Sequence, residues 1–325
     1  MKYDNILVDL NNLAHRARHT YNLSLNGLDV SVTYGVMRSI KSYMDKFSPK
    51  SIVCCFDGGI PEFRRKAVPS YKCSRDHGDP LEYEDFLRQL RELQNLALPM
   101  CGIVCVSKAG AEADDLLAQA AKIMSGRNLV ITNDKDLYQV ISDTTHLLIP
   151  HNETIITPDN FEEIAGISQE SYLDWRAIQG DNSDNIPGIP GIGEKTATKL
   201  FQEFHELTNI TNAAAGHYPG QAGLSDRLAE SIITFGFEKI CKNVFVSALY
   251  ADRVGARLAV LQAIVGFQKA QKDQVKKYLL KMAFVSLLEG FMPYTLRLEA
   301  PQVLDDVSAG CMQMPMICAK RIPVT

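Results

Sequence analysis

Seven carboxylates are spaced in a way that could bind divalent metal ions. They are Asp9, Asp57, Glu112, Asp114, Asp115, Asp134 and Asp136. Glu112 and Asp115 are three positions apart, so we expect them to share one face of a helix, with Asp114 beside them. Asp134 and Asp136 are two positions apart, so both point the same way if that segment is extended.

These carboxylates can stay ionised together only if cations neutralise them. Two bare carboxylates about 4 Å apart repel by about 4 kcal/mol at the effective dielectric of a protein surface. Oxygen-only ligands, without His or Cys, favour Mg²⁺ or Mn²⁺. Two such ions could activate water and stabilise the leaving oxygen of a phosphoryl displacement. The structural alternative is that the acids only cap turns and helices, but the joint pattern at several strand ends favours metal binding.

A doubly wound α/β sheet would bring these acids together. Runs rich in Val and Ile predict buried, mostly parallel strands at Asn5–Asp9, Ser51–Asp57, Gly102–Val106, Asn128–Thr132 and His146–Ile149. Apolar residues at helical spacing between the first two strands and before the third predict helices over 34–47 and 86–96. The acids follow strands, and ligands of an open α/β sheet bind at the carboxyl ends of its strands. After about residue 158 the chain is predicted to be mostly helical.

A glycine- and proline-rich segment, QGDNSDNIPGIPGIGEKTATKL, adds Asp181 and Asp184 and then a turn that opens a helix at Glu194. Such a helix start offers backbone N–H groups to a phosphate. The residues of this turn and helix that could contact DNA are Gly188, Gly191, Gly193, Lys195, Thr196 and Lys199. A Walker A loop is disfavoured, because Glu194 intrudes before the lysine and no strand precedes the turn.

A basic stretch follows the second strand, in PEFRRKAVPSYKCSRD. Its basic residues are Arg64, Arg65, Lys66, Lys72 and Arg75, and Tyr71 lies among them. Positive charge with an interleaved aromatic ring is suited to a single-stranded nucleic acid. A second set of lysines, around Lys272 on a C-terminal helix, is as well explained by a solvated surface. His15 and His19 lack a third zinc ligand and are predicted to be surface residues.

Length, composition and net charge limit the class of protein that the sequence can encode. The chain has 325 residues, 46% of them hydrophobic, and a formal net charge of −4, which argues against a protein that coats nucleic acid nonspecifically. Its eight cysteines form no CxxC pair and are interpreted as reduced core residues. No secretory signal or membrane-spanning run is predicted, so we expect a cytoplasmic protein, in a bacterium or a phage-infected cell.

The motifs ILVDLNNLAHRA, VCCFDGGIPEFRR, GAEADDLLA, ITNDKDLYQV and QGDNSDNIPGIPGIGEKTA occur in this order. In them, over about residues 1–290, the chain resembles the 5′-nuclease family of phage 5′-exonucleases and the 5′-nuclease domain of bacterial DNA polymerase I. The resemblance implies a PIN-like nuclease core over 1–160 with a basic arch near 60–80, a helical helix-turn-helix region over 161–295, and an extension over 296–325. It implies a stand-alone enzyme, and we expect a monomer.

The resemblance also implies roles for single residues. One metal site would comprise Asp9, Asp57, Glu112, Asp114 and Asp115, and a second would comprise Asp134, Asp136, Asp181 and Asp184. Lys72 and Arg75 would contact the scissile phosphate, and Tyr71 would stack on a base. The turn from Gly188 to Lys195 would hold duplex backbone, with a K⁺ ion bound there.

The implied function is metal-dependent cleavage of DNA at 5′ flaps, gaps or ends, as a 5′-to-3′ exonuclease and flap endonuclease of replication or repair, with RNA–DNA hybrids as further substrates. Mg²⁺ would be the cofactor, and Mn²⁺ could replace it. Three alternatives remain open: a catalytically silent DNA-binding protein, an RNA-directed nuclease and an NTPase. Assays of turnover, of RNA against DNA flaps, and of ATP hydrolysis distinguish them.

Overall fold

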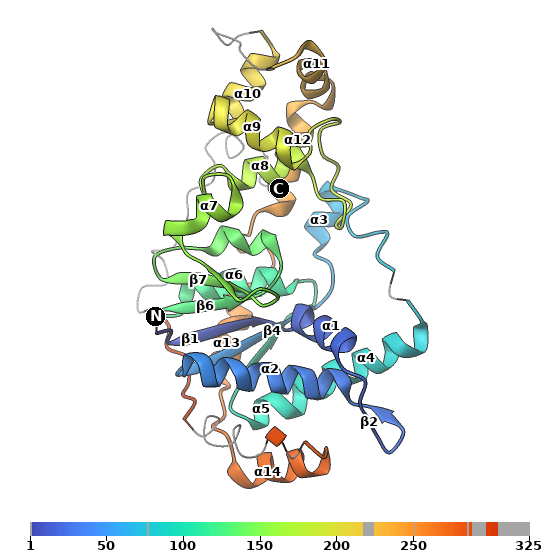
Figure 1. Cartoon of the computed structure of the whole chain (residues 1–325), viewed down its shortest axis with the longest axis vertical. Helices are drawn as coiled ribbons and strands as arrows, with labels where there is room; N and C mark the ends of the chain where they lie inside the picture. Colours follow the sequence, from blue (N-terminus) through green and yellow to red (C-terminus); the bar gives the residue numbers. More distant parts are fainter. Residues whose placement is uncertain are drawn as a thin grey trace. The chain divides into compact units, whose positions relative to one another are not determined.

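The protein is described by a computed structural model that covers residues 2–304 apart from residues 77, 217–223, 250, 285 and 288–296 (Figure 1). These residues fall into two compact units. Unit 1 takes its described residues from 1–59, 77–155 and 252–310, and unit 2 takes them from 60–76 and 156–251. The expected division at residue 160 separates the chain into two consecutive segments, whereas these units are defined by contacts between residues. Residues 60–76 therefore belong to the helical unit 2, and the described residues after 251 belong to unit 1, which contains the sheet. Of the extension expected over 296–325, residues 296 and 305–325 lie outside the described residues.

Unit 1 is built on a six-stranded sheet in the order β5-β4-β1-β6-β7-β8. Its strands are β1 (Asn5–Asp9), β4 (Ser51–Phe56), β5 (Val104–Ser107), β6 (Asn128–Ile131), β7 (Thr145–Ile149) and β8 (Thr154–Ile156). The pairs from β5 through β7 are parallel, with Asp9 opposite Cys55. The five expected strands are confirmed. The strand order reverses at β1, so the carboxyl end of β1 lies at a switch point where ligands bind in such sheets.

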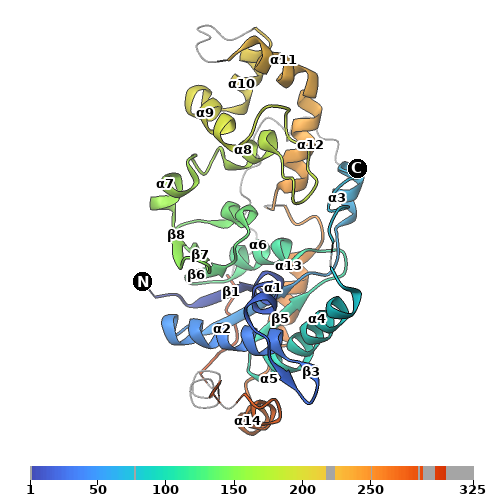
Figure 2. The same ribbon diagram turned by 45° about the vertical axis from the view of Figure 1, so that its right-hand side comes forward.

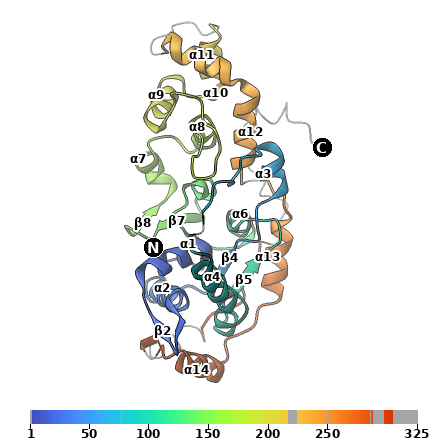
Figure 3. The same cartoon turned by 90° about the vertical axis from the view of Figure 1, so that its right-hand side faces the viewer.

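Helices cover both faces of the sheet, which confirms a doubly wound α/β fold (Figure 3). One layer contains α1 (Leu10–Thr20), α2 (Ser31–Phe47) and α4 (Pro80–Glu92), and the other contains α6 (Ala113–Ile123) and α13 (Ala256–Val265). The strands have buried side chains throughout β1 and β4, as a sheet covered on both faces requires.

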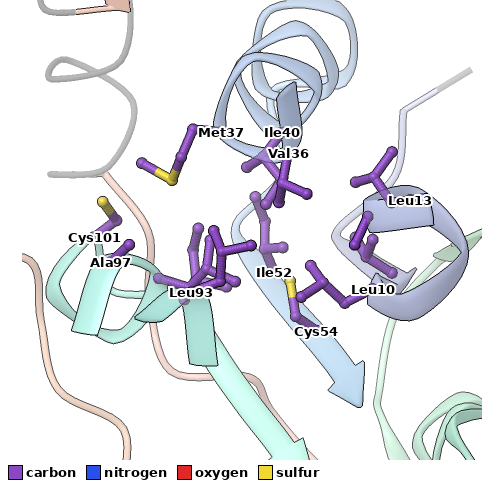
Figure 4. Close-up of a cluster of buried hydrophobic side chains, with 14 of the residues drawn as sticks. Leu10, Leu13, Val36, Met37, Ile40, Ile52, Cys54, Leu93, Ala97 and Cys101 are labelled. Atoms are coloured by element: carbon purple, nitrogen blue, oxygen red, sulfur yellow. The ribbon is translucent and has the colours of Figure 1, made fainter. Parts of the chain in front are cut away.

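The main core of unit 1 packs α1 and α2 against β4 and the end of α4 (Figure 4). Met37 and Ile40 on α2 are buried as their helical spacing predicts. The helical spacing of apolar residues over 86–96 includes Leu96, but Leu96 is 47% exposed. The turn at Leu93–Ala97 is π-helical, which shifts the helical register and turns Ala97 inward instead. Each fully buried Leu or Ile contributes about 1.5–3 kcal/mol to folding.

Smaller elements of unit 1 were not predicted. They are the hairpin β2 (Ser24–Leu25) and β3 (Leu28–Asp29), the short helix α5 (Leu98–Met100) and the 3₁₀ helix η2 (Lys135–Val140). The helix expected near the C-terminal lysines is α14 (Lys272–Lys281), and its lysines are exposed. Cys73 is exposed as well, so the expectation that the cysteines are core residues is wrong there. His15 and His19 are exposed on α1, as predicted.

Unit 2 is helical, as expected after residue 158. It comprises α3 (Glu62–Ala67), η3 (Pro158–Asn160), α7 (Phe161–Ala165), α8 (Tyr172–Gln179), α9 (Glu194–Phe204), α10 (Leu207–Ala214), α11 (Asp226–Phe235) and α12 (Phe237–Ser247). Figure 2 shows α3 alongside α12, far apart in sequence, where Phe63 and Phe245 meet edge to face with ring centroids 5.5 Å apart. In the part of the chain that is described, no helix has the length and apolar character needed to cross a membrane.

Candidate metal centre and phosphate-contacting residues

Asp9 lies where β1 ends and α1 begins, at the carboxyl edge of the sheet. Its Oδ1 accepts a hydrogen bond from the backbone N–H of Asn12 at 3.0 Å, which caps α1. Its Oδ2 accepts from the hydroxyl of Thr132 at 2.9 Å, and that hydroxyl accepts from the N–H of Asp134 at 3.0 Å. The side chain of Asp9 is therefore tied to the start of the acidic segment that follows β6.

Asp57 directly follows β4, the neighbour of β1, and a hydrogen bond connects it to the start of helix α6. Its Oδ1 accepts from the N–H of Ala113, the first residue of α6, at 2.8 Å. The backbone of Gly58 bonds to the loop before α6, donating to the carbonyl of Ala111 at 2.8 Å. A Cβ at Gly58 would lie 1.8 Å from the carbonyl oxygen of Lys108, so only glycine allows this approach.

The acids of GAEADDLL cap the N-terminus of α6. Glu112 is the N-cap residue and Asp115 the third helical residue, and each accepts a hydrogen bond from the other's backbone in a capping box. Both are buried, at 5% and 7% exposure, and Asp114 is half-buried. Glu112 therefore precedes the helix, and the expectation that it shares a helical face with Asp115 is wrong in detail.

The segment with Asp134 and Asp136 is also helical rather than extended, so that expectation is wrong. Asp134 is the N-cap of η2 and accepts from the N–H of Asp136 at 2.8 Å. The unit 1 acids are thus gathered at the N-terminal ends of α1, α6 and η2, which all begin at one edge of the sheet. Backbone N–H groups and helix dipoles favour negative charge there.

The local field at this edge is negative. Burial raises the pKa of the Cys55 thiol well above its usual range, and the charge of Asp9 raises it further. Capping hydrogen bonds use only part of the acceptor capacity of each carboxylate, which has about four lone-pair sites. The remaining oxygens are hard ligands, of the kind that hard divalent cations such as Mg²⁺ and Mn²⁺ prefer.

The other two predicted metal ligands, Asp181 and Asp184, lie in a tight turn of unit 2. Asp181 accepts from the N–H and hydroxyl of Ser183 at 2.7 and 2.6 Å and from Arg176 at 2.6 Å. Burial opposes the charge of Asp181, but these hydrogen bonds and the positive charge of Arg176 prevail and lower its pKa. Asp181 is therefore ionised at neutral pH.

Two residues of the basic stretch, Lys72 and Arg75, converge on Asp184. Its Oδ1 pairs with Arg75 at 3.0 Å, and its Oδ2 pairs with Lys72 at 3.4 Å. The backbone N–H of Lys72 donates to the carbonyl of Asp184 at 2.9 Å. Asn185 accepts from the N–H and hydroxyl of Ser74 at 3.2 and 2.8 Å. The structure thus brings Lys72 and Arg75 together beside one carboxylate, as two cations that contact one phosphate require.

Two residues of the basic stretch do not have the surroundings that their expected roles imply. The Tyr71 ring is only 6% exposed, packs with Val68, Ile186 and Val246, and its hydroxyl donates to Asp184 at 3.2 Å. A buried ring offers no face on which a base could stack.

Arg64, expected to contact DNA, is only 3% exposed, and its Nε donates to the carbonyl of Val246 at 2.9 Å. It joins α3 to α12 instead. Its neighbours Arg65 and Lys66 are exposed, as DNA contact requires.

The glycine-rich turn divides into a packed half and an open half. Gly188 lies against α8, where a Cβ would meet the carbonyl oxygen of Gln179 at 1.9 Å. Gly191 has φ +85°, and neither it nor Gly193, the N-cap of α9, has a neighbour within 4 Å of an added Cβ. Lys195 and Lys199 are exposed on α9, and Thr196 is half-buried. Gly191 and Gly193 are exposed, so a ligand can reach this half of the turn, whereas Gly188 packs against α8.

Residues that sequence reasoning missed support the acids. They are Asn11, Asn12, Thr132 and Arg176. Asn11 and Asn12 directly follow the first acid and Thr132 precedes Asp134 by two, so their positions beside the motifs were the available signal. Arg176 carries no such signal, because its pairing with Asp181 depends on the turn after α8.

Comparison with family models identifies both parts of the chain. A model described as the 5′-3′ exonuclease N-terminal resolvase-like domain matches residues 4–166. A second, described as the 5′-3′ exonuclease C-terminal SAM fold, matches residues 167–239.

Solved structures share the fold. One of T5 5′-exonuclease with bound zinc ions has a TM-score of 0.63 at 20% identity, covering 87% of this chain and 99% of the other. One of the catalytic core of Rad2 with a DNA substrate has a TM-score of 0.53 at 16% identity, covering 90% and 92%.

Curated proteins show relatedness in sequence as well. A thermostable DNA polymerase I of Thermus aquaticus is 33% identical over 309 residues, which are 93% of this chain and 34% of the polymerase. A DNA polymerase I of Mycobacterium tuberculosis H37Rv is 33% identical over 218 residues, 64% of this chain and 24% of the polymerase. The chain spans about a third or less of the length of these relatives. The family models and these identities show that the chain belongs to the 5′-3′ exonuclease family.

Proposed function

We propose that the protein is a divalent-metal-dependent 5′-nuclease that hydrolyses DNA phosphodiesters at junctions of single and double strands. The observation that carries this proposal is the convergence of acids at three helix starts on one edge of the unit 1 sheet, in a member of the 5′-3′ exonuclease family. Products would carry a 5′-phosphate and a 3′-hydroxyl.

The first ligand set would be Asp9, Asp57, Glu112, Asp114 and Asp115. Three of these, Asp9, Glu112 and Asp115, are buried, and a bound cation would offset the cost of burying their carboxylates. When bound, Mg²⁺ supplies an activated water and stabilises the leaving oxygen. The hydrogen bonds from Asn12, Thr132 and Ala113 fix the carboxylates of Asp9 and Asp57, which lowers the cost of ordering them around an ion.

The second ligand set would be Asp134, Asp136, Asp181 and Asp184, as the family resemblance implies. Its support inside unit 2 is that the surroundings hold Asp181 ionised. Lys72 and Arg75, paired with Asp184 here, would transfer their hydrogen bonds to the scissile phosphate and neutralise charge that develops on it. Because the Lys72 side chain is only 7% exposed, its charge is little weakened by solvent.

The DNA substrate is proposed to carry 5′ flaps, gaps or ends, with Arg65, Lys66, Lys195 and Lys199 as backbone contacts. The open amides of Gly191 and Gly193 would hold a phosphate of the duplex, with K⁺ as a further ion at this turn. RNA–DNA hybrids are proposed as secondary substrates, and the acting species is proposed to be a monomer.

The test uses an end-labelled 5′-flap substrate, with Mg²⁺ or with EDTA. We expect cleavage only with Mg²⁺ or Mn²⁺, and product length reports whether cutting is exonucleolytic or endonucleolytic. Asp115→Asn should lower kcat by about 100-fold or more, because a metal ligand is lost. The matched control is Asp143→Asn, an exposed acid before β7, at the opposite edge of the sheet. Equal cleavage with Mg²⁺ and EDTA would end the metal hypothesis.

A further inference from the structure

His151 is an exposed side chain at the edge of the sheet where the acids of unit 1 gather, and it is not among the predicted metal ligands. It follows β7, whose Leu148 pairs with Ile131 of the parallel strand β6. Because neighbouring parallel strands run in the same direction, both end at the same edge of the sheet. The segment after β7 that carries His151 therefore lies beside the segment after β6 that carries Asp134.

A short turn holds His151 at this edge. The side-chain oxygen of Asn152 accepts a hydrogen bond from the backbone N–H of Thr154 at 3.1 Å. The next residue, Glu153, pairs with Lys46 of α2 at 2.8 Å. The backbone around His151 is thus fixed by β7 on one side and by these contacts on the other.

The imidazole of His151 is connected to Asp9 by a series of hydrogen bonds. Its Nδ1 lies 3.2 Å from Oδ1 of Asn133. The Nδ2 of Asn133 donates to Oδ1 of Asn12 at 2.9 Å, and the backbone N–H of Asn12 donates to Oδ1 of Asp9 at 3.0 Å. Two asparagines therefore join an exposed histidine to a predicted metal ligand.

The direction of these hydrogen bonds follows from their chemistry. Oδ1 of Asn12 also accepts from the backbone N–H of Asn133 at 3.4 Å, so the amide oxygen of Asn12 is the atom that faces Asn133. The side chain of Asn133 then presents its NH₂ to Asn12 and its oxygen to His151. An amide oxygen only accepts, so Nδ1 of His151 carries a proton and donates it.

A second branch of this network reaches Asp134, which directly follows Asn133. The backbone N–H of Asp134 donates to Oγ1 of Thr132 at 3.0 Å, and that hydroxyl donates to Asp9 at 2.9 Å. The backbone over 132–134 is therefore held to Asp9 through Thr132 and to α1 through Asn133. A hydrogen bond that fixes the side chain of Asn133 limits the motion of this whole segment.

We propose that His151 is a positioning residue of the metal centre. Its Nδ1–H fixes the amide of Asn133, and through that amide it orders the carboxylate of Asp9 and the segment that carries Asp134. The proposal rests on the proposed nuclease function and adds a residue that acts on the ligands without binding an ion. Loss of a hydrogen bond made directly to a ligand weakens metal binding by about 10–100-fold. His151 is exposed and acts through two amides, so we expect a smaller loss of about three- to fivefold.

Two variants separate the hydrogen bond from the bulk of the side chain. His151→Leu removes the donor and keeps a side chain of similar size, whereas His151→Asn places an amide NH₂ where Nδ1 lies. The matched control is His19→Leu, which changes an exposed histidine in the last turn of α1.

The first measurement is the affinity for Mn²⁺ without DNA, followed by electron paramagnetic resonance. We expect His151→Leu to bind at least one ion about three- to fivefold more weakly than wild type. His151→Asn and His19→Leu should bind like wild type. Equal affinity for wild type and His151→Leu would overturn the proposal and leave the proposed function standing.

Flap cleavage distinguishes positioning of the ligands from direct contact with the substrate. His151→Leu should raise the Mg²⁺ concentration for half-maximal cleavage by about three- to fivefold, and should leave KM for DNA unchanged at saturating Mg²⁺. In an Asn133→Ala background His151→Leu should have no further effect, because both changes break the same series of hydrogen bonds. A higher KM for DNA with an unchanged Mg²⁺ requirement would overturn the proposal, since His151 would then contact the substrate.

The protonated nitrogen of His151 gives a readout that needs neither metal nor DNA. In EDTA, at a pH where the imidazole is neutral, ¹⁵N NMR should show the proton of His151 on Nδ1, because the hydrogen bond to Asn133 sets the tautomer. Asn133→Ala should remove this preference, and His19 should not change. A proton on Nε2 in wild type would overturn the proposal whatever the protein does with metal. Wild type that binds no Mn²⁺ and cleaves equally with Mg²⁺ and EDTA would instead end the proposed function, and the positioning role with it.

Discussion

Arg64 is predicted to stabilise unit 2 and not to bind DNA, although it lies in the most basic stretch of the chain. Its Nε donates to the carbonyl of Val246, and its guanidinium lies over the rings of Phe63 and Tyr71, 5.0 and 6.0 Å from their centroids. Arg64→Met leaves that buried carbonyl unpaired, which costs about 1–3 kcal/mol. The lost cation–π contacts add about 1 kcal/mol.

The total of about 2–4 kcal/mol corresponds to a fall in melting temperature of roughly 6–12 °C, at about 3 °C per kcal/mol. The assay is thermal unfolding followed by circular dichroism, and the matched variant is Arg65→Met, which changes the exposed neighbour. Arg65→Met should melt within about 1–2 °C of wild type, because exposed substitutions rarely exceed 0.5 kcal/mol. Equal melting temperatures for the two variants would refute the structural role of Arg64, and weaker DNA binding by Arg64→Met without a loss of stability would refute it too.

Two further predictions concern buried oxygens. Thr132→Val removes the hydroxyl that donates to Asp9, so the Mg²⁺ concentration for half-maximal cleavage should rise by about 10–100-fold. Asp174, on α8, has an Oδ1 without a hydrogen-bond partner in the described parts of the chain, and burial and then Glu206 raise its pKa to about 6. Its folded pKa is above the unfolded value, so its protonation stabilises the fold below about pH 4 and this contribution is lost as pH rises through about 6. Asp174→Asn should therefore gain up to about 3 kcal/mol over wild type at pH 8 and little at pH 4.

Controls separate these effects from general damage. For Thr132→Val, circular dichroism should show an unchanged fold, and an unchanged Mg²⁺ requirement would contradict the proposed support of Asp9. For Asp174→Asn, the control is Glu163→Gln, an exposed acid on α7 whose loss should change the melting temperature little at either pH. The same stability difference between Asp174→Asn and wild type at pH 4 and pH 8 would contradict the burial argument.

The sheet and its acidic edge were predictable because both depend on local patterns. Runs of Val and Ile mark strands that are buried on both faces, and the parallel register then sets their carboxyl ends at one edge. The three-residue strand β8 and the hairpin of β2 and β3 were not predicted, because segments so short carry no periodicity. The π-helical turn after α4 was not predictable either, since the leucine spacing continues through it.

The roles of Arg64 and Tyr71 could not be predicted, because they depend on contacts distant in sequence. Arg64 meets Val246 across 182 positions, and Tyr71 meets Asp184 across 113. A basic or aromatic residue in a charged stretch has the same local pattern whether it faces solvent or a second segment. The capping of helices by Asp134 and Glu112 was not predicted for a different, local reason, because a spacing of two or three residues fits both an extended and a helical segment.

The most direct test of the metal centre is binding of Mn²⁺ to the protein without DNA, followed by the electron paramagnetic resonance signal of the free ion. Wild type and the control Asp143→Asn should bind Mn²⁺ alike, and Mg²⁺ should compete. Asp9→Asn should bind at least one ion about tenfold more weakly, or lose it, because a carboxylate ligand is gone. If Asp9→Asn binds as many ions as tightly as wild type, the acidic edge of the sheet is not the metal centre.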